Sequence, residues 1–338
     1  MRRSEPVCFS VVTPTHRRKQ SLLRMLEGLA RQEYPVDQFE VVVVVDGPDD
    51  DLTGSLQKRS FPFRLRAVTQ ARSGPAVARN RGLDEATEPF VLFLDDDVVP
   101  SPCLMQQHAE SHREQNVAVI GPLLAAAAAH PTPWTIWEWA TLQEQYHAME
   151  TGSWVPTPRQ FYTGNASVRL DHVRKVGGFH PEFKRAEDVE LAWRLHDRGL
   201  RFVFNPLAKA EHLAERSFSA WLAAAHEYGR ADVMLERIRG GRDLPGWVGR
   251  EYRSRHPYTR LLARTVLAQP ELWPPIAHSG HLAAWAAGHV GLGTSAGRLC
   301  SALFTAAYWR GVGGQLGRSH TLGLIAAIEA RARAEAAA

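Results

Sequence analysis

The chain has 338 residues, a formal net charge of +4 and 44% hydrophobic residues. This length allows one large domain with an appendage, and the composition excludes a disordered chain because it supplies enough apolar residues for a core. The mild positive charge does not indicate a nucleic acid partner. The three cysteines, Cys8, Cys103 and Cys300, are far apart and lack metal-site spacing. We therefore expect unpaired core cysteines in a reducing compartment, the cytoplasm.

No run of about 18 uncharged apolar residues is present, so we expect no membrane-spanning helix. The nearest candidate, residues 282–309, contains glycine breaks as well as His289 and Arg298. This segment predicts packed helices, and it leaves peripheral contact with a membrane surface open.

Strand-like and helix-like segments alternate through the first half of the chain. Predicted strands lie at residues 7–13, 39–45, 64–69 and 90–94, the second and fourth apolar on both faces and the third an edge strand. Leucines 22, 23, 26 and 29 predict one helix by their spacing, and residues 74–86 predict another that begins at Pro75. The alternation predicts an α/β fold with a parallel sheet and helices on its faces.

Three consecutive aspartates, Asp95, Asp96 and Asp97, follow the predicted strand at 90–94. Alternate residues of an extended chain face the same way, so Asp95 and Asp97 should converge. Two convergent carboxylates repel each other unless a cation lies nearby, and Mg²⁺ or Mn²⁺ suits such oxygen ligands. An acidic turn is the structural alternative. Asp46 also follows a strand, and ligands bind beyond the carboxyl ends of parallel strands, so we expect a site at this edge.

Six segments, in this order, resemble the inverting, family 2 type of nucleotide-sugar glycosyltransferase. They are SVVTPTHRR, VVVVVDGPDD, SGPAVARNRGL, VLFLDDDVVP, TGNASVRLDHVRKVGGF and AEDVELAWRLHDRG, and they cover about residues 7–213. The resemblance implies the GT-A fold, which is Rossmann-like with a mostly parallel central sheet and helices on both faces. It also implies metal-dependent transfer of a sugar, most often from a UDP-sugar, to an acceptor hydroxyl, amine or thiol by single displacement.

The resemblance implies roles for individual residues as well. Asp188 corresponds to the general base, and Glu187 supports it or binds the acceptor. Residues implied to contact the nucleotide sugar are Thr13, Pro14, Thr15, Arg17, Asp46, Gly74, Arg79, Asn80, Asp95, Asp96 and Asn165. Residues implied to hold Mn²⁺ or Mg²⁺ are Asp95, Asp97 and His212. Ala186 departs from the family pattern, where glycine is frequent, and leaves the conformation of its loop open.

We expect a catalytic domain at 1–213, with a nucleotide-binding half at 1–121 and an acceptor-binding half at 122–213. Residues 214–338 predict a mainly helical extension. Trp134, Trp137, Trp139 and Trp154 either form an acceptor platform or fill a core, and we favour the core. The acceptor is not identified: a saccharide, lipid-linked saccharide, natural product or peptide would each be compatible, and self-association into a homo-oligomer is left open.

Two other classes of protein remain as alternatives. A sugar-nucleotide nucleotidyltransferase would share the parallel sheet, but we expect it to carry a glycine-rich phosphate loop after the first strand, where this chain has TPTHRR. A non-catalytic nucleotide-sugar-binding protein is the third alternative, and the aspartates together with Asp188 count against it.

Overall fold

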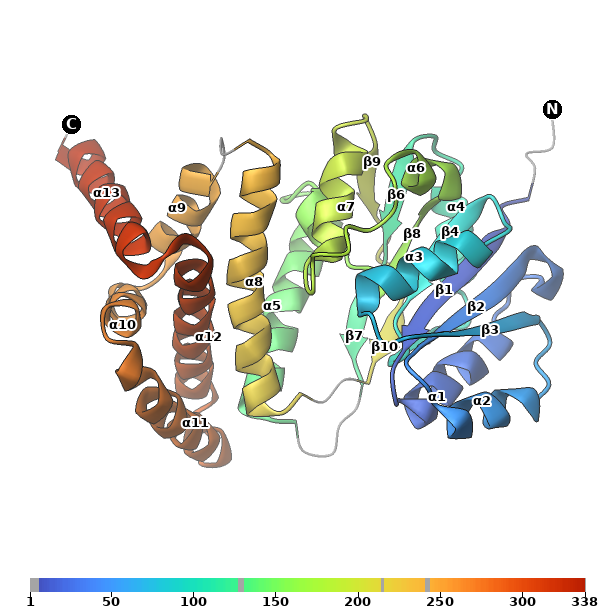
Figure 1. The fold of residues 1–338 in the computed structure, drawn as a ribbon, viewed down its shortest axis with the longest axis horizontal. Coiled ribbons are helices and arrows are strands. Elements are labelled where there is room, and N and C mark those ends of the chain that lie inside the picture. Colours follow the sequence, from blue (N-terminus) through green and yellow to red (C-terminus); the bar gives the residue numbers. More distant parts are fainter. Residues whose placement is uncertain (1–5, 127–130, 214–215, 241–243, 338) are drawn as a thin grey trace. The chain divides into compact units, whose positions relative to one another are not determined.

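The computed structural model describes residues 6–126, 131–213, 216–240 and 244–337. The chain forms two compact units (Figure 1): the first contains residues up to 128 and 141–214, and the second contains 129–140 and 215–338. The sequence-based boundary at residue 213 placed 129–140 with the first unit, whereas the structure groups them with the second. The helix α5 (Pro133–Glu150) therefore has residues in both units.

The first unit is an α/β structure whose strands and helices largely alternate. Its strands are β1 (Phe9–Thr15), β2 (Phe39–Asp46), β3 (Arg64–Gln70), β4 (Phe90–Leu94), β5 (Val98–Pro100), β6 (Val117–Ile120), β7 (Leu123–Ala125), β8 (Asn165–Arg169), β9 (Arg201–Phe204) and β10 (Ala210–His212). Its helices are α1 (Lys19–Ala30), α2 (Asp50–Gln57), α3 (Pro75–Glu85), α4 (Leu104–Ser111), α6 (Leu170–Lys175) and α7 (Glu187–His196). Short 3-10 turns lie at Val36–Gln38 and Pro158–Gln160.

Seven of these strands form one sheet in the order β3-β2-β1-β4-β8-β6-β9. The first four run parallel to one another, and β6 and β9 also pair in parallel. The strand β8 runs antiparallel to both β4 and β6. The predicted edge strand is β3, at one end of the sheet, and the predicted central strands are β2 and β4. The mostly parallel sheet is thus confirmed.

Helices cover both faces of this sheet. Successive strand residues point to opposite faces, so each strand packs against helices on both sides. On β2, Val42 and Val44 pack in a cluster with residues of α3, α6 and α7. Val41, Val43 and Val45 pack in a second cluster with residues of α1, α2 and α4. All eight residues of β2 are buried, which explains why its sequence is apolar on both faces.

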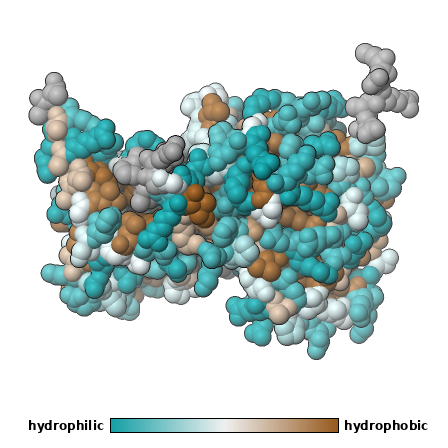
Figure 2. Space-filling view, turned by 45° about the horizontal axis from the view of Figure 1, so that its top comes forward, coloured by the Kyte–Doolittle hydropathy of each residue, from teal (hydrophilic) through white to brown (hydrophobic). Residues whose placement is uncertain are grey.

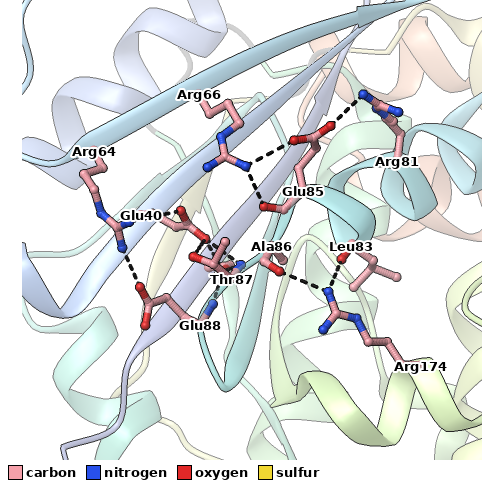
Figure 3. Close-up of polar contacts among 11 residues, drawn as sticks. Glu40, Arg64, Arg66, Arg81, Leu83, Glu85, Ala86, Thr87, Glu88 and Arg174 are labelled. Atoms are coloured by element: carbon pink, nitrogen blue, oxygen red, sulfur yellow. Dashed lines mark hydrogen bonds and ion pairs between the residues drawn. The ribbon is translucent and has the colours of Figure 1, made fainter.

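The amino-terminal ends of the parallel strands form the amino edge of the sheet. A polar cluster around the buried side chain of Glu40 stabilises this edge (Figure 3). Its carboxylate accepts hydrogen bonds from the Ser10 hydroxyl at 2.7 Å and from the Thr87 amide and hydroxyl at 2.8 and 2.7 Å. Arg174 donates to the carbonyl oxygens of Leu83 and Ala86 at the end of α3. These bonds fix the connection that leads from α3 into β4.

The second unit is helical, as predicted for this part of the chain. It contains α8 (Phe218–Ile238), α9 (Leu244–Ser254), α10 (Pro257–Ala268), a 3-10 turn at Pro270–Leu272, α11 (Trp273–His289), α12 (Gly293–Leu316) and α13 (Arg318–Ala337). Its core includes the predicted core tryptophans Trp134 and Trp137, which pack with Trp221 of α8 and residues of α12. Trp139 is half-buried, and Trp154, in the first unit, is 39% exposed.

On the face drawn in Figure 2, hydrophilic residues cover most of the surface and apolar areas are small. Within the described residues, no helix has the length and hydropathy needed to cross a bilayer. The three cysteines are unpaired, as expected, but only Cys300 is buried, whereas Cys8 and Cys103 are partly exposed. The prediction that all three are core residues was therefore wrong for two of them.

Candidate functional site

The acidic residues predicted to form a site gather at the carboxyl edge of the sheet. Asp46 ends β2, and Asp95–Asp97 follow directly after β4. The strands β2 and β4 both pair in parallel with β1, so their carboxyl ends lie at the same edge. The first turn of α7 reaches this edge through Glu187, which is linked to Asp95 by an arginine. The sheet thus assembles acids from three separate parts of the chain.

Asp46 is held by the chain segment that follows β3. Its Oδ1 accepts from Gln70 Nε2 at 2.9 Å and from the Ser73 amide at 2.8 Å, and its Oδ2 accepts from the Gly74 amide at 2.9 Å. Gly74 has φ of +91°, a conformation that favours glycine, and it is the N-cap residue of α3. Burial opposes ionisation, but these three hydrogen bonds lower the pKa of Asp46. The Asp46 carboxylate is therefore ionised at neutral pH, and its Oδ2 has room for one more donor.

Arg79 joins the strand-end aspartates to the helix α7. One guanidinium nitrogen donates to Asp95 at 2.7 Å and another donates to Glu187 at 2.6 Å. The Arg79 side chain is only 6% exposed, and burial by itself would lower its pKa, but Asp95, Glu187 and Asp188 raise it. The sequence predicted that Arg79 would flank the nucleotide. The structure places it between two carboxylates, so its charge is already compensated by protein groups, and its place beside a nucleotide stays a prediction.

Asp96 and Asp97 point to a second cation, Arg18. Arg18 Nη1 lies 3.2 Å from Asp96 Oδ1 and 2.5 Å from Asp97 Oδ2. Burial and the neighbouring aspartates raise the pKa of Asp96 to about 6, although hydrogen bonding by Thr15 and the charge of Arg18 oppose this rise. Burial also acts to raise the pKa of Asp97, but His212 and Arg18 outweigh it and the pKa is lowered.

The metal set predicted from the sequence is only partly brought together. His212 Nε2 lies 3.5 Å from Asp97 Oδ1, because β10 pairs with β5 immediately after the aspartates. Asp95 bonds Arg79 instead, and the described residues contain no group of three His, Cys, Asp or Glu side chains placed to hold a metal ion. One carboxylate and one imidazole suit a divalent cation that takes its remaining ligands from water and phosphate oxygens. The donor set thus fits a cation shared with a substrate.

The helix α7 begins with two acids beside this cluster. Ala186 precedes it with φ of +58°, in the left-handed region, which explains why glycine suits this position. Asp188 accepts from the Val189 amide at 2.8 Å, and the Thr163 amide lies 3.4 Å from its Oδ2. Burial and the charge of Glu187 raise the pKa of Asp188 to about 7, against the opposing charge of Arg79. Asp188 is therefore able to accept a proton near neutral pH.

Two asparagines predicted to contact the donor have other partners. Asn165 is fully buried, where its oxygen meets His108 Nε2 at 2.9 Å and its amide donates to the carbonyl oxygens of Pro122 and Ala208. Asn80 donates to the Phe179 carbonyl at 2.8 Å and accepts from the Phe179 amide at 2.7 Å. The Asn165 side chain thus has its hydrogen bonds inside the core, and its predicted place lining a pocket stays a prediction.

The remaining predicted donor residues surround the end of β1. Thr13 is fully buried, and within the described structure its hydroxyl lacks a hydrogen-bond partner. Pro14 is half-buried, and Thr15 donates to Asp96 at 2.7 Å. Arg17 is exposed and has φ of +54°. These residues lie beside the aspartates, and Thr15 contacts them directly.

Sequence reasoning missed Arg18 and the Ser73 amide. Arg18 belongs to the basic run His16–Lys19 directly after β1, so its position at a strand end was a usable signal. The amide of Ser73 had no such signal, because it depends on how the loop after β3 folds back over Asp46.

The fold and the site together define an enzyme of the GT-A fold class. Residues 10–177 match the model of Glycosyl transferase family 2. The chain belongs to the family 2 glycosyltransferases.

Individual relatives agree with this assignment. Over 220 residues the chain is 28% identical to the pre-mycofactocin glycosyltransferase of Mycobacterium tuberculosis. The matched region covers 62% of this chain and 44% of the relative. The chain thus spans less than half the length of that relative.

Two solved structures share the fold. The mannosyltransferase PcManGT from Pyrobaculum calidifontis, solved with GDP-Man and Mn²⁺, has a TM-score of 0.58 at 20% identity, covering 97% of this chain and 75% of its own. S. aureus TarS 1-349 in complex with UDP has a TM-score of 0.52 at 19% identity, covering 92% of each chain. Both confirm the predicted GT-A fold.

Proposed function

We propose that the protein transfers a sugar from a nucleotide sugar, a UDP-sugar in the first instance, to an acceptor nucleophile with inversion at the anomeric carbon. One observation carries this proposal: the bridge Asp95–Arg79–Glu187, in which Arg79 and Glu187 are buried, ties the aspartates after β4 to the acidic start of α7. These residues are far apart in sequence, and Arg79 and Glu187 alone are separated by 108 positions. The bridge holds a prospective base near a prospective diphosphate site.

The nucleotide would lie along the carboxyl ends of β1, β2 and β4. Asp46 supports this because its Oδ2 accepts one hydrogen bond from the described residues and can accept another from a base N–H. Thr13 supports it as well, since its buried hydroxyl is without a partner among the described residues. The part of the chain before residue 122 would thus bind the donor, and the part from 122 to 213 would bind the acceptor.

Asp188 would act as the general base. The acceptor proton passes to its carboxylate while the new bond to the anomeric carbon forms, and the nucleoside diphosphate leaves with the bonding electron pair. The raised pKa of Asp188, about 7, gives it useful basicity. Glu187 is held by Arg79, and its negative charge would contribute to the basicity of Asp188 by raising its pKa.

Asp97 and His212 would hold Mn²⁺ or Mg²⁺, which would offset the charge that develops on the leaving diphosphate. The presence of Mn²⁺ in the PcManGT structure supports a divalent cation, and the bound GDP-Man and UDP in the two neighbours support a nucleotide-linked donor. Peripheral membrane contact stays a prediction. The exposed apolar side chains Leu282, Trp285 and Val290 on and after α11 are where it would be tested.

A thermal-shift panel of UDP-sugars and GDP-sugars, with and without Mn²⁺, tests the proposal. A ligand at 100 times its Kd stabilises the folded state by about 2.7 kcal/mol, so one donor with Mn²⁺ should raise the Tm by several degrees. Asp97→Ala should lose the effect of Mn²⁺, whereas the exposed Asp37→Asn should keep it. The same donor should release its nucleoside diphosphate on prolonged incubation. If no nucleotide sugar stabilises the protein, the proposed function is wrong.

A further inference from the structure

Arg79 and Arg18 both pair with carboxylates at the carboxyl edge of the sheet, but they differ in how firmly they are held. Arg79 is 6% exposed and bonds two carboxylates of different elements. Arg18 also meets two carboxylates, Asp96 and Asp97, but its side chain is 54% exposed. A half-exposed arginine on a long stem can leave its partners for water at little cost, whereas Arg79 cannot.

We propose that Arg18 is an internal counterion that occupies the carboxylate of Asp97 until a nucleoside diphosphate arrives, and then moves to the diphosphate. Arg18 would thereby make cation binding at Asp97 depend on the nucleotide. This inference rests on the proposed function, because it assumes that the ligand of the site is a nucleoside diphosphate with a divalent cation.

The contacts of Asp97 carry the first step of the argument. Asp97 Oδ2 accepts from Arg18 at 2.5 Å, and Asp97 Oδ1 lies 3.5 Å from His212. Arg18 therefore uses one of the two oxygens of the carboxylate that is proposed to bind the cation. A divalent cation and a guanidinium compete for the same negative charge, so each weakens the binding of the other.

The backbone before Arg18 carries the second step. Arg17 adopts φ of +54°, which costs a non-glycine residue about 1–2 kcal/mol. This turn follows β1 immediately, and Arg18 then precedes α1 as its N-cap residue. Strained backbone of this kind persists where the surroundings require it, and here it accompanies the placement of Arg18 beside two aspartates from the end of β4.

The chemistry of the ligand completes the argument. A diphosphate offers oxygen acceptors that suit a guanidinium fork better than a single carboxylate oxygen does. When Arg18 transfers to the diphosphate, Asp97 regains the oxygen that Arg18 had used. Diphosphate and cation then promote each other's binding through Arg18, in addition to any direct contact between them.

The test measures Mn²⁺ binding from the electron paramagnetic resonance signal of the free ion, with and without UDP. In Arg18→Gln, Mn²⁺ without UDP should bind about tenfold more tightly than in the wild type, and UDP should strengthen its binding by a smaller factor. Arg18→Lys keeps the charge and should retain weak Mn²⁺ binding in the absence of UDP. The matched control is Lys19→Gln, which removes the same charge one residue away, where Lys19 pairs with Asp51. It should behave as the wild type.

Equal Mn²⁺ affinity in Arg18→Gln and the wild type would overturn the role of Arg18 and leave the proposed function standing. The same holds if Arg18→Gln binds Mn²⁺ more weakly. Absence of Mn²⁺ binding by the wild type, both with and without UDP, would overturn the metal-dependent function and the inference together. Mn²⁺ binding by the wild type, measured with and without UDP, thus separates failure of the inference about Arg18 from failure of the proposed function.

Discussion

The two edges of the seven-stranded sheet use similar charged side chains to different effect. At the amino edge, Glu40 is buried, but hydrogen bonds from Thr87 and Ser10 outweigh the effect of burial and lower its pKa. At the carboxyl edge, burial and like charges raise the pKa of Asp96 to about 6 and that of Asp188 to about 7. The amino edge satisfies its acid and so stabilises the fold. At the carboxyl edge, Asp96 and Asp188 keep raised pKa values, as expected where a ligand supplies further donors or a cation.

Asp188→Asn gives the largest expected effect and acts on activity alone. It should reduce transfer by about 10² to 10⁴-fold, because an amide cannot accept the acceptor proton. Stability should be unchanged or higher, since the substitution removes the repulsion between two adjacent acids. Parallel measurements of turnover and thermal unfolding check this. Loss of UDP affinity comparable to the loss of turnover would contradict the assignment of Asp188 as the base.

Glu40→Ala should act on stability alone. It leaves the Ser10 hydroxyl and the Thr87 amide and hydroxyl without their buried acceptor, which should lower the free energy of unfolding by about 3 kcal/mol. The matched control is Glu88→Ala, which removes a neighbouring acid paired with the exposed Arg64 and should cost under about 1 kcal/mol. Urea unfolding measures both. Similar costs for the two variants would show that the amino edge is not the firmly held region described above.

Glu187→Gln should give the smallest change, a shift of the pH profile. Because Glu187 raises the pKa of Asp188, neutralising it should lower that pKa, and the acidic limb of kcat/KM should move to lower pH. The apparent pKa belongs to the pair in the wild type. The exposed Glu182→Gln, five residues earlier, should leave the profile in place. The measurement is kcat/KM between pH 5 and 9. An acidic limb that stays in place or moves to higher pH in Glu187→Gln would contradict the effect of Glu187 on the pKa of Asp188.

Local pattern was enough to predict most of the sheet. The apolar run of β2 predicted a strand buried on both faces, and Pro75 correctly marked the first residue of α3. The acidic edge also followed, because parallel strands bring Asp46 and the aspartates after β4 to the same side. These features depend on periodicity and on strand direction, which the order of residues specifies.

The partners of the site residues could not be predicted in the same way. Arg79 meets Glu187 across 108 positions, and Asn165 meets His108 inside the core, so both pairings depend on packing between distant segments. The left-handed conformation of Ala186 was also hidden, because alanine gives no signal for it. Residue types identified the chemistry of this edge, but only the folded chain shows which charges are already neutralised.

The reversed direction of β8 has a consequence for the segment that surrounds Asp188. Its first residue, Asn165, pairs with Leu94, so the chain enters β8 at the same edge where it leaves β4 towards Asp95. Insertions or deletions in the segment leading into β8 would alter the surroundings of Thr163 and Asp188 while the register of β1, β2 and β4 stays fixed. Under the proposed function, changes in this segment would alter the surroundings of the proposed base and leave the strands proposed to bind the nucleotide in place.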